Sequence, residues 1–419
     1  MTLTRQVLID DLQRHAFAAS GEGTRRVGAE VELIPVDAAT RRPALIRAPA
    51  GDNAPGSLPV LQALGRRLGW EEVFSPKAGV PEFHAPDGGR VTFEPGGQIE
   101  YSAAPAGSLT ELLASLGYTV GLIRDSLADA GIDTLTAGVE PLHPIDDAPL
   151  QLSGDRYRRM DAHFASIGPH GARMMRQTAS IQLCVDRGPR PLARWHLLNA
   201  LTPYLVATFA NSPIYDGAAT GHQSTRRGIW GAVDPARTGL PVGASSDNPV
   251  EAYTDFALGA ASLFSPRPEP PFPAFGERLQ DLATTLDDWR THLTTLFPEV
   301  RPRGYFVVRS CDALPPSWYP APLVILTGLV YGPDDGRQAM EIAGAPDAAL
   351  LSRAGRCGLD DPNLAASCLE LAELGISECA RLGHDFVSPQ ILQAAADYVE
   401  HYTRRRRSPA HDVLTPAVA

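Results

Sequence analysis

The strongest constraint on the fold of this chain comes from glutamates at alternate positions of an apolar segment. Glu30 and Glu32 are two positions apart within residues 27–34, and side chains two positions apart share one face of a β-strand. Two carboxylates on one strand face repel each other unless cations or arginines neutralise them. The pattern therefore predicts either an edge strand with solvated glutamates or a strand that faces a bound cation.

A second acidic segment favours the cation. Glu94 precedes a Pro-Gly-Gly turn, which leads into a strand predicted over 97–102 that carries Glu100. If these strands are neighbours, Glu30, Glu32, Glu94 and Glu100 gather into an oxygen-rich site. Carboxylate oxygens of this kind suit Mg²⁺ or Mn²⁺.

Two other predicted strands carry polar side chains on one face. On the first, Gln182 and Cys184 share a face, while apolar residues fill the other face. On the second, Val307 and Arg309 share a face. These strands could supply an amide oxygen donor and an arginine to the same site.

Composition excludes several classes of protein. The 419 residues are 44% hydrophobic and 20% charged, which excludes a disordered or collagen-like chain. The net charge of −11 disfavours a nucleic-acid partner, because a phosphate backbone requires a basic face. No apolar run approaches the roughly 18 residues of a membrane span, so no membrane partner is expected.

Residue usage also limits the chemistry. Lys77 is the one lysine, so the chain has no Gly-Lys-Ser/Thr ending of a Walker-type phosphate loop. Any phosphate group must therefore be held by arginine and metal. Five cysteines, an odd number without zinc-ligand spacing, are typical of a reduced, cytoplasmic protein.

The chain is predicted to form one alternating α+β body. Helix-capping patterns begin at Ser108, Asp361 and Ser388, and the apolar stretch 195–210 predicts a buried helix. Residues 1–19 read as an amphipathic helix rather than a signal peptide. Strands are predicted over 27–34, 97–102, 179–185 and 305–310. Long loops are predicted over 215–250 and over the proline-rich residues 265–275.

Seven segments, taken in order, resemble the type 2 glutamate–cysteine ligases of plants and bacteria. The similarity is closest to the branch that makes γ-glutamylcysteine for ergothioneine. It extends from about residue 25 to residue 409, so that residues 1–419 read as a single catalytic domain. The segments are 28–32, 94–102, 174–186, 210–213, 224–230, 234–239 and 292–298.

The resemblance implies a fold and a reaction. The implied fold is glutamine-synthetase-like, an α+β fold with a curved antiparallel sheet forming a funnel and helices packed outside. The implied reaction uses ATP to convert the γ-carboxylate of glutamate to an acyl phosphate, which the amine of cysteine then attacks. Magnesium ions would neutralise the anions that meet in this reaction.

The resemblance also suggests roles for individual residues. Arg309 resembles the arginine that grips the transferred phosphoryl group, and its planar fork of donors suits that task. Glu30, Glu32 and Glu100 resemble metal ligands, with Gln182 as an oxygen donor beside them. Candidate substrate contacts are Arg226, Arg237, Arg301, Arg303, Thr178 and Cys184. For Arg237 and Arg303 a solvated surface charge is an equal alternative.

Two positions depart from the family pattern. Val307 stands where the family usually has a metal-binding glutamate, and Cys184 stands where it usually has an asparagine. Replacing a carboxylate by valine removes a hard oxygen ligand. Cys184 is either a packing residue or a thiol that lines the acceptor pocket.

Three functions therefore remain open. The first is a glutamate–cysteine ligase, the second a related carboxylate–amine ligase with a different acid or amine, and the third a catalytically degenerate protein that binds nucleotide. In each case the expected partners are small molecules, and a monomer or weak dimer is expected. Acceptor specificity depends on loop shapes.

Overall fold

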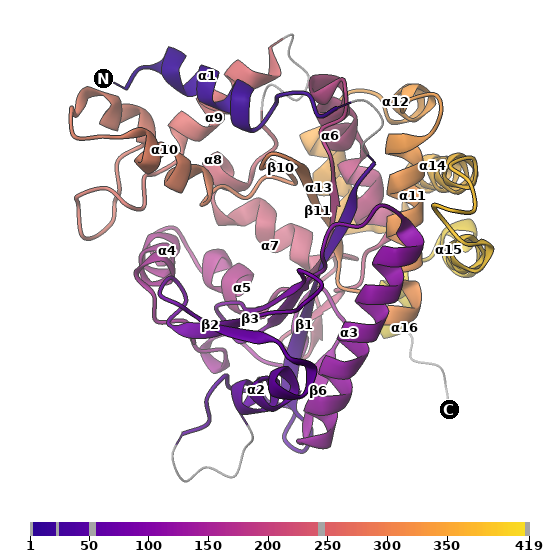
Figure 1. Cartoon of the computed structure of the whole chain (residues 1–419), viewed down its shortest axis with the longest axis horizontal. Coiled ribbons are helices and arrows are strands. Elements are labelled where there is room, and N and C mark those ends of the chain that lie inside the picture. The colour runs from indigo at the N-terminus through magenta and orange to yellow at the C-terminus, as the bar shows by residue number, and fades with distance from the viewer. Residues whose placement is uncertain (1–2, 22–24, 50–55, 242–247, 415–419) are drawn as a thin grey trace.

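The computed structural model describes residues 3–21, 25–49, 56–241 and 248–414. It is an α+β structure built on one large antiparallel sheet with helices packed around it (Figure 1). In the described residues, no helix is both long and apolar enough to cross a membrane.

The strands of the large sheet follow the order β10-β11-β7-β1-β5-β4-β3-β2, and β6 pairs with the far end of β1. A separate hairpin contains β8 and β9. The strands are β1 (Val27–Asp37), β2 (Glu71–Ser75), β3 (Val80–His84), β4 (Arg90–Phe93), β5 (Ile99–Ser102), β6 (Ile132–Leu135), β7 (Ser180–Val185), β8 (Ile214–Tyr215), β9 (Ala218–Ala219), β10 (Val300–Pro302) and β11 (Phe306–Asp312).

One group of helices covers the apolar face of the sheet. Helix α6 contacts β11, and α11 contacts β7 and is covered in turn by α14 and α15. The helices are α1 (Arg5–His15), α2 (Ser57–Leu68), α3 (Leu109–Asp129), α4 (Asp155–Ala165), α5 (His170–Gln177), α6 (Pro191–Thr208), α7 (Thr225–Val233), α8 (Pro235–Thr238), α9 (Pro249–Gly259), α10 (Leu286–Leu293), α11 (Pro320–Tyr331), α12 (Arg337–Ala343), α13 (Ala348–Cys357), α14 (Pro362–Ala380), α15 (Pro389–His401) and α16 (Pro409–Leu414).

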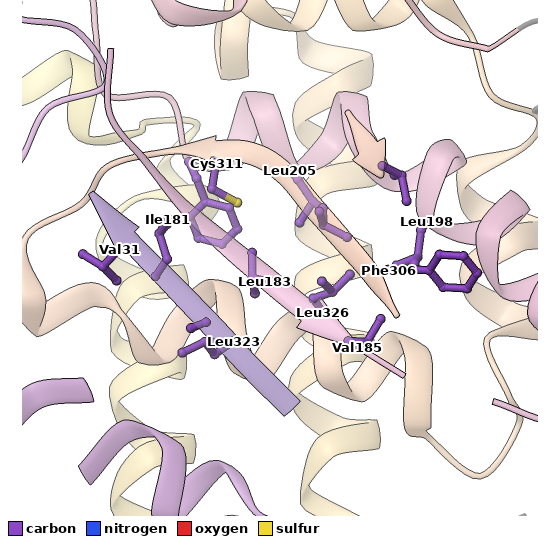
Figure 2. Packing of buried hydrophobic residues seen from close by; sticks show 14 of the residues in the cluster. Val31, Ile181, Leu183, Val185, Leu198, Leu205, Phe306, Cys311, Leu323 and Leu326 are labelled. Carbon is purple, nitrogen blue, oxygen red and sulfur yellow. The ribbon is translucent and has the colours of Figure 1, made fainter. Parts of the chain in front are cut away.

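Alternation along the central strands separates an apolar face from a polar one. Val31 of β1 and Ile181 and Leu183 of β7 are buried against the outer helices, where they meet Leu205 of α6 and Leu326 of α11 (Figure 2). The side chains between them on each strand point to the opposite face. That opposite face therefore carries the polar residues of these strands.

A bulge in β11 changes its register against β7. Val308 pairs with Leu183 and Cys311 with Ile181, so two residues, Arg309 and Ser310, stand opposite Gln182. The extra residue bends the strand locally. The backbone N–H of Arg309 donates to the carbonyl of Glu299 instead, at 2.9 Å.

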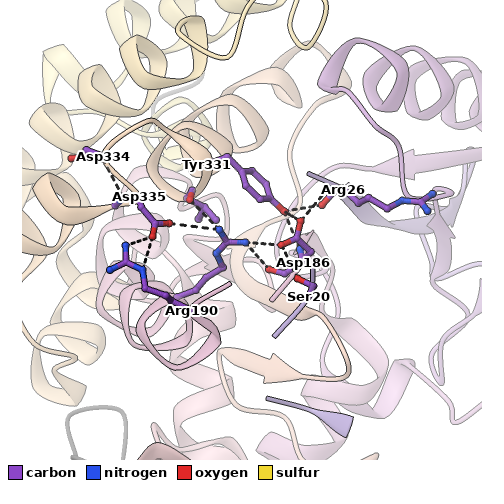
Figure 3. A network of polar contacts seen from close by, with 10 residues as sticks. Ser20, Arg26, Asp186, Arg190, Tyr331, Asp334 and Asp335 are labelled. Carbon is purple, nitrogen blue, oxygen red and sulfur yellow. Dashed lines mark hydrogen bonds and ion pairs between the residues drawn. The ribbon is translucent and has the colours of Figure 1, made fainter. Parts of the chain in front are cut away.

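A buried polar network fixes one end of β7 and the start of β1 (Figure 3). Arg194 donates to a carboxylate oxygen of Asp186 at 2.7 Å, and its guanidinium lies 4.8 Å from the ring centre of Tyr331. The Tyr331 hydroxyl is 2.9 Å from both the Asp186 carboxylate and the carbonyl of Arg26. These contacts tie α6 and α11 to the strands that carry the polar face.

Most of the expected elements are present. All four expected strands exist, and Ser108, Asp361 and Ser388 cap α3, α14 and α15 as predicted. The buried helix expected over 195–210 is α6, and the helix expected over 1–19 is α1, with residues 1–2 outside the described part.

The prediction of a long loop over 215–250 is wrong. This stretch contains α7, α8, the end of the β8–β9 hairpin and the beginning of α9, while residues 242–247 lie outside the described part. Helix α7 forms because Ser224 caps it, accepting from the N–H of Arg227 at 3.1 Å, and also donates to Asp312 at 3.0 Å. The hydrogen bond from Ser224 to Asp312 therefore adds to the local capping bond that starts α7.

Candidate active site

A cavity of about 360 Å³ lies on the polar face of the sheet. Residues of β1, β3, β4, β5, β7, β10 and β11 line it, so the sheet curves around a single space. Helices α4 and α5, Trp230 of α7 and the segment 294–297 close the other side. Lys77, the one lysine of the chain, lies on the β2–β3 turn and also lines this cavity.

The four predicted carboxylates meet on the floor of the cavity, which we call the acidic floor: Glu30, Glu32, Glu94 and Glu100. Glu32 of β1 stands directly opposite Glu100 of β5, and Glu30 stands opposite Gln182 of β7. The expectation that the two acidic segments form neighbouring strands is thus confirmed. Glu30 and Glu32 do not lie on a solvated edge strand, because β1 is central.

A tight turn delivers Glu94 to this floor. Gly97 has a φ of +91°, which favours glycine, and the N–H of Gly97 donates to the carbonyl of Glu94 at 2.8 Å. The side chain of Gln98 anchors the turn, accepting from the N–H of Gly96 at 3.0 Å and donating to the carbonyl of Thr178 at 2.9 Å. The Pro-Gly-Gly turn is therefore fastened to the start of β7.

A glutamine separates the acidic floor from an arginine. Gln182 donates from Nε2 to Glu32 Oε1 at 2.9 Å and accepts at Oε1 from Arg309 Nη1 at 2.8 Å. Glu32 also accepts from the hydroxyl of Ser180 at 2.9 Å. The neutral amide thus stands between a carboxylate and a guanidinium that would otherwise be free to pair.

Burial makes the acidic floor costly to ionise. Burial, reinforced by Glu32, raises the pKa of Glu94 from 4.5 to about 8. The pKa of Glu100 is also well above its ordinary value, because of burial and then the neighbouring Glu30. Burial likewise raises the pKa of Glu32, although Arg226 and Arg309 oppose it. A bound cation would relieve this cost.

Beside the acidic floor, the cavity is lined by an arginine wall, formed by Arg156, Arg301, Arg303 and Arg309. In the part of the chain that the structure describes, none of these four arginines forms an ion pair with a carboxylate. The pKa of Arg301 lies well below its ordinary value, because of burial and then the neighbouring Arg303. Burial also lowers the pKa of Arg309. Unpaired guanidiniums in such a cavity favour an anionic ligand.

The end of helix α10 holds two of these arginines. Arg156 donates to the hydroxyl and to the carbonyl of Thr294, both at 2.7 Å, and Arg301 donates to the same carbonyl. Thr294 is the residue that follows α10, where helix carbonyls carry partial negative charge. This end therefore orients Arg156 and Arg301 without using a carboxylate.

Not every predicted contact reaches the cavity. Arg301, Arg303, Arg309 and Thr178 line it, but Arg226, Arg237 and Cys184 do not. Arg226 is buried and donates to the carbonyl of Arg309 at 2.9 Å, which makes it a support for that residue.

Arg237 is fully enclosed by the fold. Its guanidinium donates to Thr295 and Ala261 carbonyls at 2.8 and 2.6 Å and to Asp234 at 3.3 Å. Both alternatives considered from the sequence are therefore wrong for Arg237, because it neither lines the cavity nor lies on the surface. Its bonds instead fasten the segment that carries Phe297.

Cys184 pairs with Val307 across β7 and β11. Burial, reinforced by Glu30, raises the pKa of its thiol well above the ordinary value. Val307 shares the inward face with Arg309, as expected, but it is only 1% exposed and does not line the cavity. These two residues fill space beside the cavity.

Several cavity residues carry no signal in the sequence. Arg156 lies on α4 in an arginine-rich stretch, and only the fold shows that it faces the cavity. Trp230 and Phe297 fall within segments that resemble the family, yet residue type alone assigns them no role. Their selection requires knowing which helix and loop close the cavity.

Comparison with solved structures places the fold. A glutamate–cysteine ligase from Francisella tularensis, solved in complex with AMP, superposes with a TM-score of 0.54 over 93% of this chain and 84% of that chain, at 13% identity. The expected α+β, glutamine-synthetase-like fold is thereby confirmed, with an antiparallel sheet and outer helices. At this level of identity the likeness concerns the fold alone.

Sequence comparisons define the family. The model of glutamate–cysteine ligase family 2 matches residues 26–400. The glutamate–cysteine ligase EgtA of Mycolicibacterium smegmatis is 34% identical over 368 residues, which cover 84% of each chain. A chloroplastic glutamate–cysteine ligase of Arabidopsis thaliana is 31% identical over 364 residues, covering 81% of this chain and 65% of that one. The chain belongs to glutamate–cysteine ligase family 2.

The raised pKa of Glu94 makes a prediction for stability. Folded protein holds the Glu94 proton up to about pH 8, whereas unfolded protein releases it near pH 4.5, so the free energy of unfolding falls as the pH rises between these values. Glu94→Gln removes this loss. Without added metal, we expect the variant to match the wild type at pH 5 and to exceed it by about 1 kcal/mol or more at pH 8.

Urea denaturation at pH 5 and pH 8 measures this difference. Glu71→Gln is the matched control, because Glu71 is exposed on β2 and its replacement should change neither value by more than about 0.5 kcal/mol. A Glu94→Gln protein whose advantage is the same at both pH values would show that Glu94 does not retain its proton in the folded state.

Proposed function

We propose that this protein joins the γ-carboxylate of glutamate to the amine of cysteine at the expense of ATP, giving γ-glutamylcysteine, ADP and phosphate. The observation that carries the proposal is a single cavity that contains both the acidic floor and the arginine wall. The family and the activity named for its relatives support an ATP-dependent ligase. The match over residues 26–400 supports one catalytic domain.

The reaction has two steps that balance. A γ-carboxylate oxygen of glutamate attacks the γ-phosphorus of ATP, and the bond from that phosphorus to the ADP oxygen breaks. The amine nitrogen then attacks the carbonyl carbon of the acyl phosphate, phosphate leaves with the bonding electron pair, and the nitrogen loses a proton. Both steps bring anions together, which is why the site must supply positive charge.

The residues of the acidic floor fit divalent cations. Burial raises the pKa values of Glu32, Glu94 and Glu100, and a bound cation would relieve this cost and the repulsion among the carboxylates. Among the described residues, no group of three or more histidine, cysteine or acidic side chains is arranged to hold a metal alone. Mg²⁺ commonly uses one or two carboxylates together with water and substrate phosphates, so this arrangement suits it.

We propose that Glu30, Glu32, Glu94 and Glu100, with Gln182, hold Mg²⁺ or Mn²⁺ beside the nucleotide. When bound, the metal would neutralise charge on the phosphate oxygens. The side chains provide the remaining functions. Arg309 presents donors to the transferred phosphoryl group, and Arg156, Arg301 and Arg303 neutralise the other anionic groups.

Apolar residues close the cavity opposite the sheet. Met160, Met174 and Met175 line it together with Trp230 and Phe297. An acyl phosphate is readily hydrolysed, so a lining that excludes water protects the intermediate until the amine arrives.

All five cysteines are free, which supports a reducing, cytoplasmic setting. The relatives named EgtA support a place in ergothioneine biosynthesis.

A second candidate is a ligase of the same type that uses another amine. Val307 and Cys184 favour it, because they pair with each other beside the cavity where the family resemblance leads one to expect a carboxylate and an amide. Two polar groups are thus replaced by an apolar and a weakly polar one at the same place.

Acceptor-dependent ADP release tests the proposal. Purified protein is given ATP, Mg²⁺ and glutamate, and ADP is measured with no acceptor and with a panel of amines that includes cysteine, serine, alanine and glycine. We expect cysteine to increase ADP release at least about 10-fold above the other amines, since a site shaped for the cysteine side chain binds side chains of another size less tightly in the transition state. Equal stimulation by another amine would favour the second candidate, and no release with any amine would contradict both.

Val307→Glu tests whether the acidic floor can be extended. Val307 pairs with Arg301 and Cys184 and shares a face with Arg309, so neighbouring guanidiniums favour an ionised carboxylate there. We expect the variant to fold. The Mg²⁺ concentration that gives half-maximal ADP release should be lower than in the wild type by a factor of about 3 or more.

Val307→Gln is the matched control, because glutamine has the same size without the charge. An equal shift in both variants, or no shift in Val307→Glu, would contradict the proposed position of the metal relative to β11. Circular dichroism establishes that each variant is folded before the titration.

A further inference from the structure

Aromatic rings and guanidiniums alternate along the arginine wall. The guanidinium carbon of Arg309 lies 5.1 Å from the ring centre of Trp230 and 6.0 Å from that of Phe297. These two rings pack edge to face, with centres 6.0 Å apart and planes at 76°. Arg309 is therefore held against two aromatic side chains at once.

The alternation continues beyond Arg309 on both sides. Arg226 lies 5.5 Å from the Trp230 ring, and Arg301 lies 5.6 Å from the Phe297 ring. Arg226 and Trp230 are four residues apart on α7, which places them on one face of that helix. We call this row of five side chains, contributed by α7, β11, β10 and the segment after α10, the arginine–aromatic row.

The two rings stabilise the positive charge of Arg309. Burial lowers its pKa, and no carboxylate pairs with it among the described residues. An aromatic face attracts a cation through its quadrupole and accepts no conventional hydrogen bond from the edge of the guanidinium. The rings therefore stabilise the charge and leave the N–H donors available.

The donors of Arg309 are in fact largely unused. Nη1 donates to Gln182, and among the described residues the buried Nε has no hydrogen-bond partner. Arg194 differs from Arg309. It also lies over a ring, that of Tyr331, but it donates a hydrogen bond to the Asp186 carboxylate. Arg194 is thus a structural arginine, whereas Arg309 is held ready for a ligand.

The backbone of Arg309 is fixed separately from its side chain. Its N–H donates to the carbonyl of Glu299 and its carbonyl accepts from Arg226, each at 2.9 Å. These bonds set where the side chain begins. Beyond that point, Gln182 and the two rings are the contacts that orient the guanidinium within the described part of the chain.

We propose that Trp230 and Phe297 are positioning residues that hold Arg309 through its faces, so that its free N–H donors point at the phosphoryl group. This inference rests on the proposed function of Arg309. A carboxylate in place of the rings would also stabilise the charge, but it would compete with the anionic ligand for the same donors.

A double-mutant cycle on nucleotide binding tests this role. Trp230→Leu and Phe297→Leu are each made in the wild type and in Arg309→Lys, and the affinity for β,γ-imido-ATP with Mg²⁺ is measured by calorimetry. In the wild-type background we expect each leucine variant to lose about 10- to 30-fold in affinity. In the Arg309→Lys background, whose ammonium is a point charge without a planar fork, the loss should shrink to less than about 3-fold.

The controls separate positioning from packing. Trp230→Phe retains a ring and should lose less than about 3-fold, whereas Trp318→Leu removes a tryptophan that stacks on His401 outside the cavity and should leave the affinity unchanged. If Trp230→Leu does not fold, Phe297→Leu carries the same comparison.

Equal losses in both backgrounds would overturn the inference, because the rings would then act on the ligand or the fold without Arg309. Failure of the wild type to bind the analogue at all would instead contradict the proposed function and the inference together.

Steady-state kinetics give a second test that does not rely on the binding measurement. Both leucine variants should lower kcat while the KM for glutamate changes by less than about 2-fold.

Discussion

Charges in the cavity are kept apart, and the proposed chemistry depends on that separation. Glu32 and Arg309 would satisfy each other as a direct ion pair, but the amide of Gln182 stands between them, donating to one and accepting from the other. The negative charge of the acidic floor and the positive charge of the arginine wall are therefore not neutralised by each other. Metal and phosphate together supply both, so the ligands complete an electrostatic arrangement that the protein leaves open.

The rest of the structure maintains this separation. Strands β1 and β7 place their apolar side chains against α6 and α11, which forces Glu30, Glu32 and Gln182 to the other face. The bulge in β11 adds one residue opposite Gln182 without moving Arg309 from the inward face. At the far end, the Arg194–Asp186–Tyr331 network ties both strands to the outer helices, so the register that sets the charge positions is fixed from outside the site.

The sequence predicted the strands and several helices because their signals are local. Alternating glutamates mark β1, and capping residues such as Ser108 mark helix starts, so both could be identified without knowing the fold. Arginines were different. Arg226 and Arg237 were predicted to contact substrate, but neither lines the cavity. Residue type does not distinguish them from Arg301, which does line it. The resemblance to a family supplied the fold and function, which the patterns alone left open.

The most direct test of the account compares Mg²⁺ binding with and without nucleotide. Because the described residues offer no group of three or more histidine, cysteine or acidic side chains that could hold a metal ion, Mg²⁺ should bind weakly to the free protein. Calorimetric titration in the presence of saturating β,γ-imido-ATP should show affinity at least about 10-fold higher, and by linkage Mg²⁺ should tighten nucleotide binding by the same factor. Mg²⁺ affinity that is unchanged by the nucleotide would show that the floor and the wall act independently, and it would contradict the account.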